Sequence, residues 1–150
     1  MKDSGYMGIA LEEARAAAAR GEVPVGAVLV DGASGEILAC AGNRTEETAD
    51  PTAHAEMLVI REAAAASGAP RLAGCDLYVT LEPCAMCAAA ISFARIRRLY
   101  YGVEDPKGGG VDHGPRFFGQ PTCHHRPEVY GGIAEREAGE LLRAFFRERR

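Results

Sequence analysis

Two short motifs contain residue types that together can bind a metal ion and move protons. The first is His54-Ala-Glu56, and the second, thirty residues further on, is Pro83-Cys84-Ala-Met-Cys87. Because Cys84 and Cys87 are three residues apart, both thiols lie on one side of the first turn of an expected helix. Unpaired N–H groups at a helix start favour the thiolate, which is the form that binds metal. Imidazole and thiolate groups suit zinc, so His54, Cys84 and Cys87 are its expected ligands.

Three protein ligands leave a fourth coordination position for water, which is typical of catalytic zinc sites. Zinc lowers the pKa of bound water from about 15.7 to roughly 7, and Glu56 can then carry its proton to a substrate. His54 and Glu56 would point in different directions inside a regular helix. They can meet at one ion only if His54 lies at the mouth of the helix.

A lone Cys-x-x-Cys pair is more often half of a structural zinc site or a redox pair. A structural site needs a second Cys-x-x-Cys or a His-x-x-x-His, and the sequence contains neither. A redox pair would leave His54-Ala-Glu56 unexplained, whereas the combined pattern is the signature of nucleobase deaminases. Cys123, His124 and His125 raise the hypothesis of a second metal site, although we favour reading them as ordinary loop residues.

Strand-length and helix-length patterns alternate along the chain. We expect helices from Met7 to about Arg20, from Pro51 to about Ser67, from Pro83 through Ala90, and around Ala138–Phe145. We expect strands at 25–30, 36–40, 77–80, 99–101 and around Val129, with a polar loop at 43–51 and a long functional loop at 104–127. This order predicts an α/β protein, a three-layer α/β/α sandwich with a mixed, roughly five-stranded central sheet.

The composition is that of a single folded domain over residues 1–150. The formal net charge of −4 argues against a broad basic surface for nucleic acid, but local groups such as Arg95, Arg97 and Arg98 leave room for a basic rim. Five cysteines are an odd count for a disulfide framework, and no apolar stretch is long enough to span a membrane. We therefore expect a cytoplasmic protein.

Longer stretches resemble a known family in the same order along the chain. They include Glu22-Val-Pro-Val-Gly-Ala-Val-Leu-Val30, Gly42-Asn-Arg44, Asp50-Pro-Thr-Ala-His-Ala-Glu56, Leu77-Tyr-Val-Thr-Leu-Glu-Pro-Cys-Ala-Met-Cys87, Asp105-Pro-Lys107 and Phe145-Phe-Arg147. In these stretches the chain resembles the bacterial tRNA-specific adenosine deaminases of the cytidine deaminase-like superfamily. Residues 108–127 depart from the commoner family pattern, so we assign no substrate contact there.

The resemblance implies a hydrolase that converts the wobble adenosine of a tRNA anticodon loop to inosine and releases ammonia. It implies one Zn²⁺ per chain, with Glu56 as the catalytic proton carrier. Asn43 matches a base-contacting asparagine, while Asp105, Lys107 and Phe146 match positions at the RNA-binding rim. The implied partners are the tRNA anticodon stem-loop and a second copy of the chain in a homodimer.

Two other functions remain open at this stage. A deaminase of a free nucleobase, guanine or cytosine, would keep the same three ligands and Glu56. A non-catalytic, zinc-structured RNA-binding module would keep the ligands alone. Glu56 argues against such a module, because a structural site has no use for an unpaired carboxylate beside the metal.

Overall fold

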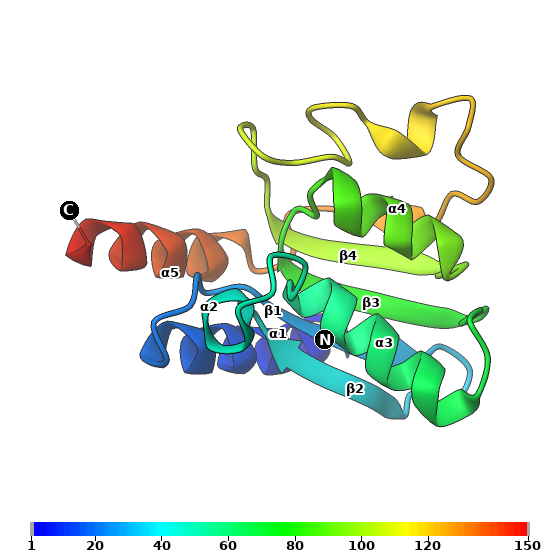
Figure 1. Ribbon diagram of the computed structural model, residues 1–150, viewed down its shortest axis with the longest axis horizontal. Coiled ribbons are helices and arrows are strands. Elements are labelled where there is room, and N and C mark those ends of the chain that lie inside the picture. The colour runs from blue at the N-terminus through cyan, green and yellow to red at the C-terminus, as the bar shows by residue number, and fades with distance from the viewer. Residues whose placement is uncertain (1, 150) are drawn as a thin grey trace.

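The computed structural model describes residues 2–149, and side chains from residue 5 onward (Figure 1). The helices are α1 (Lys2–Ala19), α2 (Thr45–Thr48), α3 (Ala55–Ser67), α4 (Ala85–Phe93) and α5 (Glu135–Glu148). The strands are β1 (Gly26–Asp31), β2 (Ile37–Gly42), β3 (Cys75–Leu81), β4 (Arg98–Val103) and β5 (Glu128–Tyr130). No helix in this part of the chain is long and apolar enough to cross a membrane.

The five strands form one mixed sheet in the order β2-β1-β3-β4-β5. Strand β1 is antiparallel to both of its neighbours, whereas β3, β4 and β5 run parallel. Consequently β2, β3 and β4 all end at the same edge of the sheet. The segments that follow these three strands contain Asn43, Cys84 and Asp105, so the topology brings these residues to one edge. Ligands of open α/β sheets bind at such carboxyl ends.

Each face of the sheet carries its own hydrophobic core, because side chains alternate between faces along a strand. On one face, Leu77 and Val79 pack with α3 and α4 residues such as Val59 and Ile91. On the other face, Tyr78 belongs to a cluster with residues of α1 and with Ala138 of α5. Helices α3 and α4 therefore cover one side and α1 and α5 the other (Figure 1). The predicted three-layer α/β/α fold is confirmed.

The predicted start of the second long helix at Pro51 is wrong. Helix α3 begins at Ala55, with His54 in an extended N-cap conformation. The Asp50 carboxylate instead accepts hydrogen bonds from the backbone N–H and the hydroxyl of Thr52, which closes a local turn. The predicted polar loop at 43–51 also contains the short helix α2, which the sequence pattern did not indicate.

Two other predicted elements compare more closely with the structure. Helix α4 begins at Ala85 rather than Pro83, with Cys84 as its N-cap. The long loop at 104–127 contains one short 3₁₀ turn, at Phe117–Gly119, and the buried Phe118 side chain belongs to the core on the α3 and α4 side. This loop is therefore packed onto the domain rather than projecting from it.

Candidate active site

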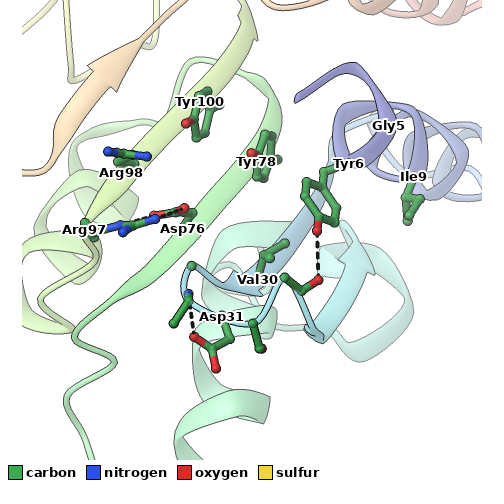
Figure 2. A pocket seen from close by; sticks show the side chains of 14 residues that line it. Gly5, Tyr6, Ile9, Val30, Asp31, Asp76, Tyr78, Arg97, Arg98 and Tyr100 are labelled. Carbon is green, nitrogen blue, oxygen red and sulfur yellow. Dashed lines mark hydrogen bonds and ion pairs between the residues drawn. The ribbon is translucent and has the colours of Figure 1, made fainter. Parts of the chain in front are cut away.

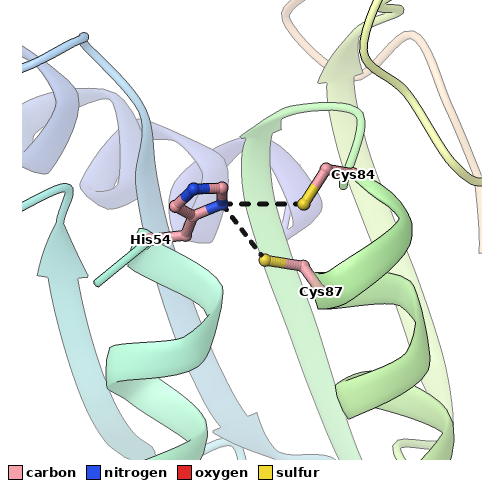
Figure 3. Close-up of side chains that lie close together, drawn as sticks. All are labelled: His54, Cys84 and Cys87. Carbon is pink, nitrogen blue, oxygen red and sulfur yellow. Dashed lines mark hydrogen bonds between the residues drawn. The ribbon is translucent and has the colours of Figure 1, made fainter. Parts of the chain in front are cut away.

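The three predicted metal ligands lie together at the amino ends of α3 and α4 (Figure 3). His54 is the N-cap of α3, Cys84 is the N-cap of α4, and Cys87 follows in the first turn of α4. The His54 Nδ1 atom lies 3.6 Å from the Cys84 Sγ atom and 3.5 Å from the Cys87 Sγ atom. Because His54 precedes the first helical residue, its ring can turn toward the thiols while Glu56 projects from the helix.

The local electrostatics favour a thiolate at this point. Hydrogen bonds from the Cys87 thiol and from His54 lower the pKa of Cys84 to about 4. The hydrogen bond to Cys84 and burial raise the pKa of Cys87, so one proton is shared between the two sulfurs. The hydrogen bond with Cys84 also raises the pKa of His54. This donor set of one imidazole and two sulfurs fits zinc, whose binding would displace the shared proton.

Glu56 is a titratable residue in direct contact with this triad. Its side chain is buried in the first turn of α3 and is hydrogen-bonded to the Cys87 thiol. Burial raises the pKa of the Glu56 carboxyl to about 7. A carboxyl group with a pKa near neutrality can both accept and return a proton, which is what general acid–base catalysis requires.

Within residues 2–149, His54, Cys84 and Cys87 are the one group of three or more His, Cys, Asp or Glu residues placed to hold a metal. Cys123 and His125 are engaged elsewhere, and the Cys123 thiol donates to the His125 carbonyl oxygen over 3.2 Å. The Ser92 hydroxyl donates to the His125 carbonyl oxygen over 2.7 Å, and the His125 Nε2 atom lies 2.7 Å from the Ile96 carbonyl oxygen. These contacts pin the loop to the end of α4, as expected for ordinary loop residues.

Asn43 directly follows β2 and reaches the start of α3. Its side-chain oxygen accepts a hydrogen bond from the backbone N–H of Ala55 over 2.8 Å. The His54 side chain makes no capping hydrogen bond at this helix start, so Asn43 supplies a cap from a distant segment. The structure therefore places Asn43 beside the metal-ligand helix, with its amide orientation set by that bond.

Asp105, Lys107 and Phe146 line one cavity of about 640 Å³ between α5 and the segment after β4. We call this cavity the α5 groove. Phe145 is 7% exposed and belongs to the core, whereas Phe146 is 48% exposed and faces the groove. Leu81, three residues before Cys84, also lines the groove, so the groove begins at the same sheet edge as the metal ligands. The three predicted rim residues thus share one surface.

Two buried carboxylates near this edge were missed by sequence reasoning. Glu22 accepts hydrogen bonds from the backbone N–H groups of Glu46 and Glu47, which hold α2 in place. Glu82 lies two residues before Cys84 and holds the segment after β4. A signal that could have found both is their position, because Glu22 shortly precedes one predicted strand and Glu82 shortly follows another, where a charged side chain must be paired to be buried.

A second cleft, of about 700 Å³, lies at the opposite ends of β3 and β4 (Figure 2). Tyr78 and Tyr100 stack there with ring centroids 4.4 Å apart and planes 4° apart, so their ring faces cover each other. Arg97 forms a bidentate ion pair with Asp76. The Asp76 carboxylate in this cleft is therefore already paired, and none of His54, Cys84 and Cys87 lines it.

The sheet order, the imidazole and two-thiol triad and the buried carboxylate beside it define a zinc-dependent deaminase. Residues 1–103 match the family described as the cytidine and deoxycytidylate deaminase zinc-binding region. A tRNA-specific adenosine deaminase of Agrobacterium fabrum (strain C58) is 66% identical over 97% of this chain and 94% of the relative. One of Bacillus subtilis (strain 168) is 48% identical over 99% of this chain and 91% of the relative. The chain belongs to the family of tRNA-specific adenosine deaminases.

Solved structures agree with this placement. A chain from a study of A-to-I editing by tRNA:A34 deaminases at the wobble position of transfer RNA is 64% identical, with a TM-score of 0.89. The match covers 92% of this chain and 99% of that one. A guanine deaminase from Nitrosomonas europaea is 25% identical, with a TM-score of 0.82 over 95% of this chain and 83% of that one. The same architecture therefore serves substrates of different size.

Proposed function

We propose that the protein hydrolyses the 6-amino group of the wobble adenosine in a tRNA anticodon loop, giving inosine and ammonia. The observation that carries this proposal is the buried Glu56 carboxyl placed against the His54, Cys84 and Cys87 triad. This arrangement occurs in a chain that matches a tRNA-specific adenosine deaminase over 97% of its length. A single deaminase domain over residues 1–150 is part of the proposal.

His54, Cys84 and Cys87 would hold the zinc ion, which would lower the pKa of water and so make a hydroxide nucleophile available at neutral pH. Glu56 accepts the proton that this water releases and delivers it to N1 of the adenine ring. A C6–O bond forms while the ring gains that proton. Glu56 then takes the remaining hydroxyl proton and gives it to the amino group, so the C6–N bond breaks and ammonia leaves. A carboxyl pKa of about 7 suits both transfers.

The substrate contacts are proposed from their positions. The oxygen of the Asn43 amide is bound to Ala55, so its Nδ2 hydrogens are the donors it can offer to a base. The exposed Phe146 ring offers a stacking surface for an unpaired base, and Lys107 offers a cation for the backbone phosphates. Asp105 fixes the turn that carries Lys107, because its carboxylate accepts hydrogen bonds from the N–H groups of Lys107 and Gly108.

The decisive experiment uses zinc-loaded protein with an arginine-tRNA anticodon stem-loop that carries wobble adenosine. Free guanine, cytosine and adenosine are assayed in parallel for ammonia. We expect inosine from the wild type and none from Glu56→Gln, which should still bind one zinc ion per chain. Ammonia from a free base alone would instead establish the free-base deaminase. Zinc binding without turnover of any substrate would establish the non-catalytic module.

The free-base alternative is supported by the likeness to the guanine deaminase from Nitrosomonas europaea. The α5 groove favours the tRNA substrate, because Lys107 and Phe146 extend the binding surface beyond the size of one base. The burial of Glu56 beside the triad opposes the non-catalytic module, since burying an ionisable group costs stability and a purely structural zinc site has no need of that group.

We further propose that the protein is a homodimer that acts in the cytoplasm. Helix α4 leaves Phe93 66% exposed, and it also exposes Ala85. Met86, Ala89 and Ala90 of the same helix are only partly covered, so small and apolar side chains make up the uncovered surface of α4. Such a surface favours close packing against a second copy. The five unpaired cysteines and the tRNA substrate favour a reducing compartment.

A further inference from the structure

Glu82 is a carboxylate whose side chain is completely buried, immediately before the metal-ligand motif. One oxygen accepts from the Asp105 N–H over 2.9 Å and lies 2.8 Å from the His113 Nδ1 atom. The other accepts from three consecutive N–H groups, those of Val111, Asp112 and His113, over 3.2, 2.9 and 3.1 Å. Five donors therefore converge on one anion, an arrangement known as a nest.

The donors all come from residues 105–113, which we call the clasp loop. This loop carries Asp105 and Lys107 into the α5 groove at one end. Its middle rests against the start of α4, where the Gly110 N–H donates to the Pro83 carbonyl oxygen over 2.8 Å. Glu82 thus lies between the metal-ligand helix and the wall of the groove, and it holds the two together.

The close packing around Glu82 leaves no room for a side chain at Gly109 or Gly110 of the clasp loop. A Cβ atom added to Gly109 would lie 2.5 Å from the Glu82 carboxyl carbon. One added to Gly110 would lie 2.5 Å from the Ala85 nitrogen. The glycines let the loop backbone approach the carboxylate and the helix start closely enough for its N–H groups to donate. The loop is therefore shaped around this anion.

We propose that Glu82 is a positioning residue for tRNA recognition, which sets the clasp loop and through it the places of Asp105 and Lys107 without contacting the substrate. The inference rests on the proposed function, because it concerns how the same site binds its anticodon loop. A carboxylate is required, since a glutamine amide would place its own N–H groups against those of the loop. An unpaired buried donor is costly, so the loop would open instead.

The first test compares Glu82→Gln with the wild type on the anticodon stem-loop. We expect KM to rise about tenfold, equivalent to about 1.4 kcal/mol of lost binding, with kcat changed less than about threefold. Zinc content should stay at one per chain. The matched control is Asp76→Asn, which neutralises a buried carboxylate at the other end of β3 that is paired with Arg97 and should leave KM unchanged.

Variants at His113 test the contact between Glu82 and the clasp loop with less risk to folding, because the His113 side chain is 27% exposed. His113→Ala removes one donor to Glu82 and should raise KM several-fold. His113→Asn places an amide nitrogen near the same position and should restore part of the wild-type KM. A purely structural role would lower thermal stability in both variants without this recovery of KM.

Amide hydrogen exchange tests the clasp independently of turnover. The peptide covering residues 105–113 should exchange much faster in Glu82→Gln, while a peptide from α3 should keep its wild-type rate. A wild-type KM, unchanged exchange of the clasp loop, or loss of zinc together with kcat would each overturn the inference. If the wild type formed no inosine, the proposed function would fail, whereas the exchange result would still decide whether Glu82 holds the loop.

Discussion

The side-chain oxygen of Asn43 accepts the hydrogen bond of the first backbone N–H in α3, that of Ala55, over 2.8 Å. This contact joins the segment after β2 to the helix start that carries His54 and Glu56. It also orients the amide, because the oxygen is already used. Asn43 thereby caps α3 through its side-chain oxygen and keeps its Nδ2 hydrogens as the donors proposed for the base. Substitution can separate these two roles.

Asn43→Asp keeps the acceptor and loses the donor. We expect its unfolding free energy to stay near that of the wild type, since an anion at a helix start is favourable, while KM for the stem-loop rises. Asn43→Ala should raise KM and also lose about 1 kcal/mol of stability, the usual value of a helix N-cap. Denaturant unfolding and steady-state kinetics measure the two effects. A wild-type KM for Asn43→Asp would leave Asn43 with a structural role only.

Removal of zinc should destabilise the fold as well as stop turnover. A ligand present at about 100 times its Kd stabilises the folded state by about 2.7 kcal/mol, so chelation should lower the melting temperature and added zinc should restore it. Cys87→Ser should lose this response to zinc. Cys123→Ser, which changes a thiol outside the triad, should respond as the wild type does. Equal zinc dependence in the two variants would contradict the assigned ligand set.

The adjacent pair Phe145 and Phe146 should separate stability from RNA binding. Phe145→Ala opens the core under α5 and should cost about 3 kcal/mol in unfolding free energy. Phe146→Ala should leave stability almost unchanged but weaken stem-loop binding by about 1–3 kcal/mol, the value of one stacked base. Calorimetry and a binding titration measure these effects. Undiminished RNA affinity in Phe146→Ala would remove Phe146 from the binding surface.

Glu22 should make stability depend on pH in the acid range. Burial acts to raise its pKa, but hydrogen bonds from the N–H groups of Glu47 and Glu46 outweigh burial and lower the pKa below its usual value of 4.5. A lowered folded-state pKa stabilises the protein above the unfolded-state value, and this contribution disappears as pH falls through the folded-state pKa. The stability gap between wild type and Glu22→Gln should therefore be largest near neutral pH and close in acid. A gap that stays constant down to pH 3 would show that the Glu22 charge contributes nothing.

A charge on the uncovered surface of α4 should prevent self-association. Phe93 is 66% exposed, so Phe93→Glu adds a charge with little effect on the monomer. We expect light scattering to give a dimer for the wild type and a monomer for this variant. Ile37→Glu changes another exposed apolar residue, on β2, and serves as the control. A wild type that remains monomeric at working concentration would refute the dimer.

The ligand triad could be predicted from sequence because metal chemistry restricts residue types and spacing more tightly than helix propensity does. The start of α3 was predicted four residues early, since Asp50 and Pro51 resemble a helix start until the bond from Thr52 to the Asp50 carboxylate is seen. Glu82 was missed because its partners lie more than twenty residues away in a loop without periodicity. Helical spacing alone leaves open which of Phe145 and Phe146 faces inward, since that choice depends on how α5 lies on β4.

Every group assigned here to chemistry or substrate lies at the edge where β2, β3 and β4 end. The turns at the opposite edge, such as the exposed residues 68–71 between α3 and β3, connect the secondary-structure elements and contain none of these groups. Exposed connections of this kind accept added residues readily. The protein can thus be lengthened, labelled or fused to another domain at these turns, while the edge that carries the metal ligands and the α5 groove keeps its geometry.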